Sequence, residues 1–240
     1  IWPTLHIGPS PVAGKRRVYM VQRNSTTSHG TAGPSENPYF IYADFDGDDI
    51  ENGVPFVWNH TTIPEMDSWN HDAVIWRRPF HAITVDNSGN VYYMGYHFAY
   101  NADDESLQEA DLDVFKCDNY GQGTWTRISG FSNIPTWNPP GLQGGTNGYF
   151  VDENSIGYPD NQLAWVIASS SHLNATTDVN GKLHSIANWC MGHVEGGIWI
   201  DFHFVKEFVF DPATEEFAVR EVYPKKDPND THNQAFTPWD

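Results

Sequence analysis

Short apolar and aromatic runs, separated by turns rich in Asp, Asn and Gly, recur along the chain. In residues 81–96 and 173–188 two such runs flank an Asp-x-x-Gly turn, and a looser copy with a different turn spans 4–23. Runs of this length are typical of β-strands, and the Gly supplies the positive φ that a tight hairpin turn requires. The pattern therefore predicts three β-hairpins.

A second hairpin is expected after each of these three, following an insertion of variable length. Its two strands flank an acidic or Asp-containing turn, and we expect them at 39–43 with 56–58, at 114–117 with 124–128, and at 208–210 with 217–222. The pattern thus predicts three units of four strands each. Residues 235–240 resemble the beginnings of the earlier units and are expected to start a further one.

A four-stranded antiparallel sheet that recurs in the same strand order is the blade of a β-propeller. We therefore predict an all-β fold in which residues 1–240 form part of one β-propeller domain. The blades are expected at about 1–70, 71–135 and 163–224. Because a propeller needs at least about four blades, three consecutive blades predict a larger propeller. A β-sandwich is the alternative, and it explains the strands but not their recurring order.

Composition agrees with strands and narrows the set of partners. Ten Trp, eleven Tyr and fourteen Phe make 15% of the 240 residues aromatic, which favours strands over helices. The formal net charge of -18 gives a surface that repels nucleic-acid phosphates and anionic lipid heads. No run approaches the roughly 18 apolar residues of a membrane helix. We expect neither nucleic-acid partners nor insertion into a membrane.

The chain opens with Ile1 and shows no signal peptide, which we interpret as a cleaved mature chain or a piece of a longer protein. Its two cysteines, Cys117 and Cys190, are too few for a disulfide framework. Whether these two residues pair with each other is left open by the sequence.

The segment 117–125 reads Cys-Asp-Asn-Tyr-Gly-Gln-Gly-Thr-Trp and resembles the Asp-box of sialidase-like propellers, a Ser-x-Asp-x-Gly-x-Thr-Trp hairpin turn. A Cys stands near the Ser position, and one extra residue lies on each side of the Gly. More broadly, the Asp-rich turns and aromatic strands resemble large secreted propellers of the Bacteroidota. This resemblance implies a propeller in an extracellular or cell-surface protein. An Asp-box is a structural turn, so it implies nothing about catalysis.

Several histidines lie on or beside expected first and second strands. First strands line the channel of a propeller, where a His could act as a base, an acid or a metal ligand. Polysaccharide lyases on propeller folds use groups of His, Tyr and Arg, so the catalytic candidates are His81, Tyr96 and His172. The structural alternative is an ordinary hydrogen-bonded His within a sheet.

Two tryptophans fall in expected loops rather than strands. Trp69 and Trp137 are flanked by Asn, Asp and Pro residues. An exposed indole offers a flat face on which a sugar ring stacks, so both are candidate ligand-binding residues. Packing within the loop is the structural alternative.

An acidic stretch follows the strand expected at 39–43. Asp44, Asp46 and Asp48 place carboxylates at alternate positions, which is how a loop surrounds calcium with oxygen ligands. The stretch differs from an EF-hand, because Asp49 and Pro55 stand where that motif has Gly and Glu. A calcium site is therefore one interpretation, and a solvated acidic turn is the other.

Two classes of function follow from these observations. The first is a secreted or cell-surface propeller module that binds glycans or other proteins through loops on one face. The second is a polysaccharide-degrading enzyme, a lyase or a glycoside hydrolase, with its site at the mouth of the channel. Phosphate-binding loops and serine-hydrolase elbows are not present in the sequence, so neither nucleotide chemistry nor serine hydrolysis is supported.

Overall fold

The computed structural model describes residues 3–23, 38–68, 80–100, 108–129, 138, 150–167, 173–193 and 198–223. The fold is all-β, with three antiparallel sheets built from consecutive hairpins. Sheet 1 contains β1 (Thr4–Pro9), β2 (Arg16–Arg23), β3 (Pro38–Phe45) and β4 (Asn59–Thr62) in that order. Sheet 2 contains β5 (Phe80–Val85), β6 (Val91–Tyr100), β7 (Gln108–Cys117) and β8 (Trp125–Ser129) in that order.

Sheet 3 repeats this order with one addition. It contains β10 (Asn174–Thr177), β11 (Leu183–His193), β12 (Ile198–Asp211) and β13 (Glu216–Tyr223). A further strand, β9 (Leu163–Ile167), pairs with the second half of β11, while β10 pairs with the first half. The two short strands thus lie one after the other along the same edge of β11. The predicted strand order is confirmed in all three sheets.

Within the described residues, four short helical segments lie between the strands: α1 (Gly47–Glu51), α2 (Pro64–Ser68), η1 (Asn119–Gly121) and η3 (Asp160–Gln162). The sequence analysis was wrong in placing a strand at 56–58, since the fourth strand of sheet 1 is β4. The acidic turn before it is the helix α1, because Asp46 caps its N-terminus and favours helical backbone over a tight hairpin. Within the described residues, no helix is long and apolar enough to cross a membrane.

The two predicted Asp-x-x-Gly turns have the same hydrogen bonds. One oxygen of Asp86 accepts the N–H groups of Ser88 and Asn90, both at 2.9 Å. Asp178 does the same for the residues two and four positions further on. Gly89 and Gly181 take φ values of 83° and 79°, as a hairpin of this type requires. The predicted turns are confirmed.

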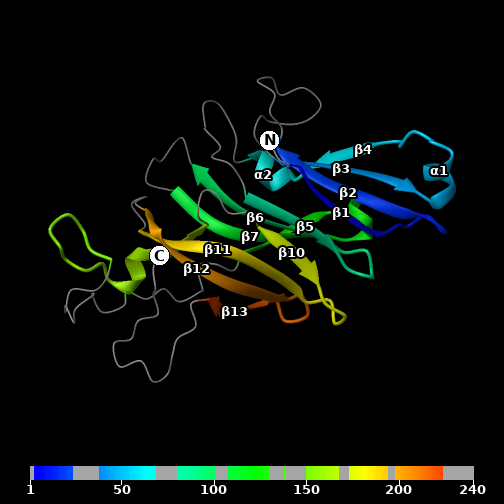
Figure 1. Ribbon diagram of the computed structural model, residues 1–240. Helices are drawn as coiled ribbons and strands as arrows, with labels where there is room; N and C mark the ends of the chain where they lie inside the picture. The colour runs from blue at the N-terminus through cyan, green and yellow to red at the C-terminus, as the bar shows by residue number, and fades with distance from the viewer. Residues whose placement is uncertain are drawn as a thin grey trace.

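The three sheets stack in chain order, with sheet 2 between the other two (Figure 1). The first strand of sheet 2, β5, contacts the first strands of both neighbours, β1 and β10. Two hydrogen bonds cross between these strands, from the Thr4 hydroxyl to the His81 carbonyl and from the Thr177 hydroxyl to the Val85 carbonyl, at 3.3 and 3.4 Å. The sheets are therefore joined along their first strands.

The apolar core between sheets 1 and 2 is formed by facing side chains of the two sheets. Ten of these side chains are buried: Tyr19, Val21, Phe40, Ile63, Ile83, Val85, Val91, Tyr93, Phe115 and Cys117. Burying an aromatic or branched side chain contributes about 1.5–3 kcal/mol relative to leaving it in water. This face-to-face burial holds sheet 1 on sheet 2.

One buried ion pair also lies at this contact. Arg17 is 1% exposed and donates to both carboxylate oxygens of Asp44, at 2.7 and 2.6 Å. Its third donor reaches the carbonyl of Tyr120 in sheet 2 at 2.9 Å, and its guanidinium lies 4.2 Å from the ring centre of Tyr42. Arg17 thereby joins β2, β3 and the 117–125 turn, which resembles an Asp-box.

Both cysteines are free thiols buried in different sheets, so the open question of a disulfide is answered. Burial raises the pKa of Cys117 to about 11 and that of Cys190 to about 12. Thiols with such pKa values stay protonated and unreactive at neutral pH.

The two equivalent turn glycines offer a matched test of this architecture. A Cβ on Gly89 would lie 2.6 Å from the ring of Tyr120, whereas a Cβ on Gly181 would have no atom within 4 Å. We expect Gly181→Ala to lower the free energy of unfolding by about 1–2 kcal/mol through its positive φ alone. Gly89→Ala should cost about 1–3 kcal/mol more, because Tyr120 must move. Urea unfolding measures both, and equal losses would contradict the close packing of the 117–125 turn on the Asp86 turn.

Candidate functional site

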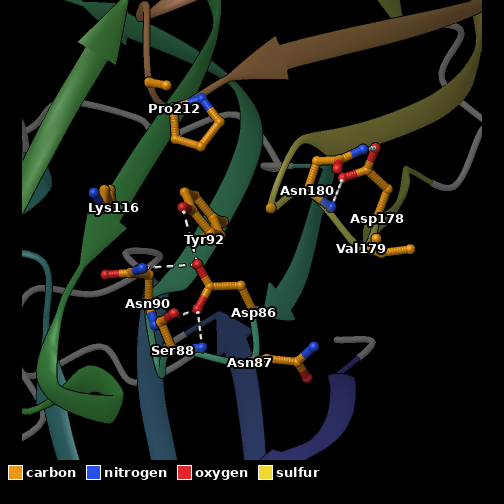
Figure 2. Close-up of a pocket in the computed structure, with 12 residues that line it drawn as sticks. Asp86, Asn87, Ser88, Asn90, Tyr92, Lys116, Asp178, Val179, Asn180 and Pro212 are labelled. Atoms are coloured by element: carbon orange, nitrogen blue, oxygen red, sulfur yellow. Dashed lines mark hydrogen bonds between the residues drawn. The ribbon is translucent and has the colours of Figure 1, made fainter.

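A pocket of about 370 Å³ lies where the hairpin turns of sheets 2 and 3 meet (Figure 2). Its walls are the β5–β6 turn, the β10–β11 turn and the β12–β13 turn, with Tyr92 and Lys116 between them. The lining residues are Asp86, Asn87, Ser88, Asn90, Tyr92, Lys116, Asp178, Val179, Asn180, Gly181, Pro212 and Ala213. Amides, hydroxyls and charged groups dominate this surface.

The pocket forms because the same Asp-x-x-Gly turn occurs in the first hairpin of both sheet 2 and sheet 3. Both Asp turns end the first hairpin of their sheet, so stacking the sheets brings the two turns to the same edge. Tyr92 and Lys116 occupy opposite register positions on β6 and β7. They lie on the face of sheet 2 that is directed toward sheet 3, since the opposite face packs against sheet 1.

Both carboxylate oxygens of Asp86 accept hydrogen bonds from its own turn, and one also accepts a hydrogen bond from Tyr92. One oxygen accepts two backbone N–H groups, and the other accepts the Asn90 side-chain amide at 2.7 Å and the Tyr92 hydroxyl at 3.4 Å. Burial, followed by the nearby Asp86 charge, raises the pKa of Tyr92 well above its ordinary value. Tyr92 is therefore a neutral hydroxyl group at physiological pH and a poor base.

Asp178 is held in the same way on the opposite wall. It accepts the N–H groups of Asn180 and Lys182 at 2.8 and 2.9 Å, and the bond from Lys182 is the largest cause of its lowered pKa. Its second oxygen lies 3.5 Å from Nε2 of His184, an ionic contact only when that imidazole is protonated. Asp178 therefore stays ionised and committed to its turn.

Lys116 differs from Lys182, which also lies near this edge of the sheets. Lys182 forms an ion pair with Asp211 at 2.7 Å. No carboxylate of the described residues forms an ion pair with Lys116, although its side chain lines the pocket. Its ammonium group and the exposed amide of Asn87 are thus donors available to a ligand, and the Asn180 amide, which donates one N–H to Asp178 at 3.4 Å, has a second N–H to offer. The two carboxylates of the described lining, Asp86 and Asp178, are both held by their own turns.

Of the three predicted catalytic residues, the structure describes the side chain of His81, which does not line this pocket. His81 is in β5, and its ring stacks on Tyr93 with 5.8 Å between ring centres, in the contact between sheets 1 and 2. Tyr96 in β6 pairs with Phe80 in β5, next to the pair of His81 and Gly95. His172 is outside the described residues. The catalytic assignment stays a prediction.

The predicted ligand-binding tryptophans, Trp69 and Trp137, also lie outside the described residues, so their role in binding remains a prediction.

Most of the residues that line the pocket are predicted by the sequence only as residues of hairpin turns. Their usable signal was the repetition of Asp-x-x-Gly in two first hairpins, which predicts that both turns reach the same edge of adjacent sheets.

The three predicted calcium ligands are placed around the start of α1. Asp44 accepts hydrogen bonds from Arg17 and, at 2.6 Å, from Ser10. Asp46 caps the helix and lies 3.5 Å from the ammonium of Lys15, while Asp48 is exposed in the first turn. Within the described residues, no three His, Cys, Asp or Glu side chains are grouped as metal ligands. Calcium binding here stays a prediction.

No protein-family model matches the chain, and no curated protein matches it. Among solved structures, the chain is similar to the Hadza microbial sialidase Hz136, with 10% identity and a TM-score of 0.46 over 91% of this chain and 36% of that one. It is also similar to the polysaccharide lyase Uly1, with 11% identity and a TM-score of 0.41 over 92% of this chain and 40% of that one. The chain thus spans 36 to 40% of the length of these proteins. We therefore base the proposed function on the chain's own residues.

The Arg17–Asp44 pair gives a pH-dependent prediction. Burial raises the pKa of Asp44, but the hydrogen bonds from Arg17 and Ser10 outweigh it and leave this pKa below its ordinary value. A lowered carboxyl pKa contributes stability that is present above the unfolded pKa, about 3.9, and is lost as the pH falls through the folded pKa. Asp44→Asn leaves the Arg17 charge unpaired, so we expect a loss of about 2 kcal/mol at pH 7 after allowing for the partial exposure of Asp44.

Urea unfolding at pH 7 and pH 3 tests this prediction, because the difference between Asp44→Asn and wild type should narrow at the lower pH. Asp48→Asn is the matched control, since Asp48 is exposed and should change stability by less than about 0.5 kcal/mol. A loss for Asp44→Asn that is the same at both pH values would contradict the role of its charge.

Proposed function

We propose that this chain is part of a secreted or cell-surface β-propeller that binds glycans through the pocket between the Asp86 and Asp178 turns. The observation that carries the proposal is the concave, polar edge between adjacent sheets, where Lys116 has no ion-pair partner among the described residues and Asp86 and Asp178 accept hydrogen bonds within their own turns. The extracellular location rests on the resemblance of the Asp-rich turns and aromatic strands to large secreted propellers.

Three features support the propeller. The four main strands of each sheet follow one another in chain order, and the chain passes from the fourth strand of one sheet to the first of the next, by way of β9 between β8 and β10. The first strands β1, β5 and β10 are neighbours, as innermost strands around an axis would be. Sheet 2 is covered on both faces, whereas a sandwich has two layers that each present one outer face to solvent.

The chemistry of the pocket favours a saccharide among small ligands. Sugars present many hydroxyl oxygens that accept hydrogen bonds, and Lys116, Asn87 and Asn180 supply donors. Pro212 adds an apolar ring to an otherwise polar lining, against which the apolar face of a sugar can lie. A pocket of about 370 Å³ falls within the usual range for small-ligand sites. The alternative partner is a protein loop, because its carbonyl oxygens accept the same hydrogen bonds.

Degradation of a polysaccharide is less well supported at this pocket. A glycoside hydrolase needs two carboxyl groups about 5–10 Å apart that face the sugar, and a lyase needs an accessible base beside a cation. Asp86 and Asp178 are both committed to their turns, and Tyr92 has a raised pKa. Binding therefore remains the better proposal for the pocket residues.

The test is a binding screen followed by a matched pair of variants. Immobilised neutral and acidic polysaccharides are screened for retention of the chain, and an oligosaccharide of any retained polymer is titrated by calorimetry. Asn180→Ala and Lys116→Met should each weaken binding about tenfold through loss of one ligand hydrogen bond. Asn154→Ala is the control, because Asn154 holds the same position in the Asp152 turn but does not line the pocket.

Two results would overturn the proposal. Unchanged affinity in both pocket variants would place the glycan elsewhere on the molecule. New reducing or unsaturated ends in the incubated polysaccharide would favour the enzyme, and His81→Ala and His172→Ala then test the sequence-based catalytic candidates.

A further inference from the structure

His184 in β11 lies next to one wall of the pocket, on the face of sheet 3 that is opposite the buried side chains of Leu183 and Ser185. Its imidazole lies between two carboxylates. Nδ1 is 2.8 Å from Oε1 of Glu207, and Nε2 is 3.5 Å from Oδ2 of Asp178. Asp178 lines the pocket. A titratable ring is thus connected to the pocket through a single side chain.

The short contact with Glu207 decides which ring nitrogen carries the proton. Because a carboxylate oxygen only accepts hydrogen bonds, Nδ1 of His184 is the donor and holds the proton of the neutral ring. Nε2 is then an acceptor that faces an acceptor oxygen of Asp178. Nε2 is buried and has no hydrogen-bond partner in the part of the chain that the structure describes. The neutral ring therefore leaves one buried nitrogen unpaired, which costs free energy.

Protonation turns this unpaired nitrogen into a donor. The Nε2–H group of the charged ring can donate to Oδ2 of Asp178, while Nδ1 keeps its hydrogen bond to Glu207. Both bonds of the charged ring are charge-assisted, so they are stronger than bonds between neutral groups. The side chain of His184 is 22% exposed, which lets it exchange protons with the solvent.

The other charged groups on this face of sheet 3 are mostly acidic. Glu207 pairs with Arg220 at 3.6 Å, and Asp211 pairs with Lys182 at 2.7 Å. Among the described residues, the charged groups that share the face with His184 come from the β10–β11 turn, β11, β12 and β13: Asp178, Lys182, Glu207, Asp211, Glu216 and Arg220. A charged imidazole therefore adds a cation to a face on which carboxylates outnumber basic groups.

The oxygen of Asp178 that faces His184 already has a weak partner in the pocket. Oδ2 accepts a hydrogen bond from the side-chain amide of Asn180 at 3.4 Å (Figure 2), which is longer than an ordinary hydrogen bond. The other oxygen, Oδ1, accepts the backbone N–H groups of Asn180 and Lys182. A charged imidazole at Oδ2 thus competes with the Asn180 amide, while the bonds that form the turn are kept.

We propose that His184 is a positioning residue of the pocket: its protonation gives Oδ2 of Asp178 a stronger donor than the Asn180 amide and so frees a second N–H group of Asn180 for a ligand. This inference rests on the proposed function, because it describes how the same pocket is regulated. A saccharide that accepts hydrogen bonds from both N–H groups binds the protonated form more tightly. By linkage, saccharide binding favours uptake of a proton by His184.

Nuclear magnetic resonance of the free chain tests the first step without a ligand. Between about pH 8 and about pH 5.5, where histidines change charge, the ring nitrogens of His184 should pass from the Nδ1–H form to the doubly protonated form. The side-chain amide resonances of Asn180 should shift over the same pH range as the ring, because the amide loses its bond to Asp178. An Asn180 amide that stays constant while His184 titrates would overturn the inference.

A pair of histidine variants assigns the shift to the correct ring. His184→Leu should abolish the pH-dependent shift of the Asn180 amide. His60→Leu is the matched control, because His60 is an exposed histidine in β4 of sheet 1, and this variant should keep the shift. Amide spectra and thermal unfolding show whether both variants are folded. If His184→Leu does not fold, the wild-type titration still decides, since it needs no variant.

Calorimetry with an oligosaccharide of a polymer retained in the binding screen tests the second step. From about pH 8 to about pH 5.5 the affinity of the wild-type chain should rise about threefold to tenfold, the effect of one additional hydrogen bond. The binding heat should differ between buffers of different ionisation enthalpy, because a proton is taken up. Both effects should be lost in His184→Leu and kept in His60→Leu.

The two steps separate this inference from the proposed function. Saccharide binding with the same affinity at both pH values would overturn the inference and leave the proposed function standing. If no saccharide binds, but the Asn180 amide shifts as His184 titrates and fails to shift in His184→Leu, the proposed function fails. The coupling of His184 to the pocket wall is then supported.

Discussion

The contact between sheets 1 and 2 is the interaction on which the rest of the structure depends. A four-stranded sheet has two faces, and no single hairpin can hide its apolar side chains alone. Tyr19 and Phe40 from one sheet meet Tyr93 and Phe115 from the other, which removes a large apolar area from water. Arg17 is tolerated there because Asp44 and the Tyr120 carbonyl satisfy its donors. The same kind of stacking, of sheet 3 on the opposite face of sheet 2, brings together the turns that line the pocket.

The same local turn serves different ends according to where the tertiary structure places it. Asp86, Asp178 and Asp152 each accept backbone N–H groups two and four residues further along the chain. In the Asp152 turn a serine, Ser155, takes the left-handed backbone that a glycine takes in the others, with φ at 62°. The Asp86 and Asp178 turns form two walls of a pocket, whereas the Asp152 turn does not line it. Local chemistry therefore makes the turn, and sheet stacking makes the site.

Charge is distributed unevenly over this acidic chain. Carboxylates gather in turns and around α1, where Lys15, Arg17 and Lys182 neutralise several of them through ion pairs. Lys116 stands in the pocket without such a partner among the described residues. It is a positive charge where an anionic or polar ligand meets less repulsion than the net charge imposes elsewhere.

The sequence by itself determined the hairpins, since alternating apolar residues and Asp-x-x-Gly turns act over a few residues and need no distant partner. It also determined the four-strand order of each sheet, because consecutive hairpins pair with their neighbours in the chain. It misplaced the fourth strand of sheet 1, where the capping of α1 by Asp46 replaced the expected turn. Only the tertiary structure decided which turns lie side by side, that Arg17 forms an ion pair with Asp44, and that Lys116 and Asn180 line the same pocket. These contacts join residues far apart in sequence, and their geometry depends on how whole sheets stack rather than on any local pattern.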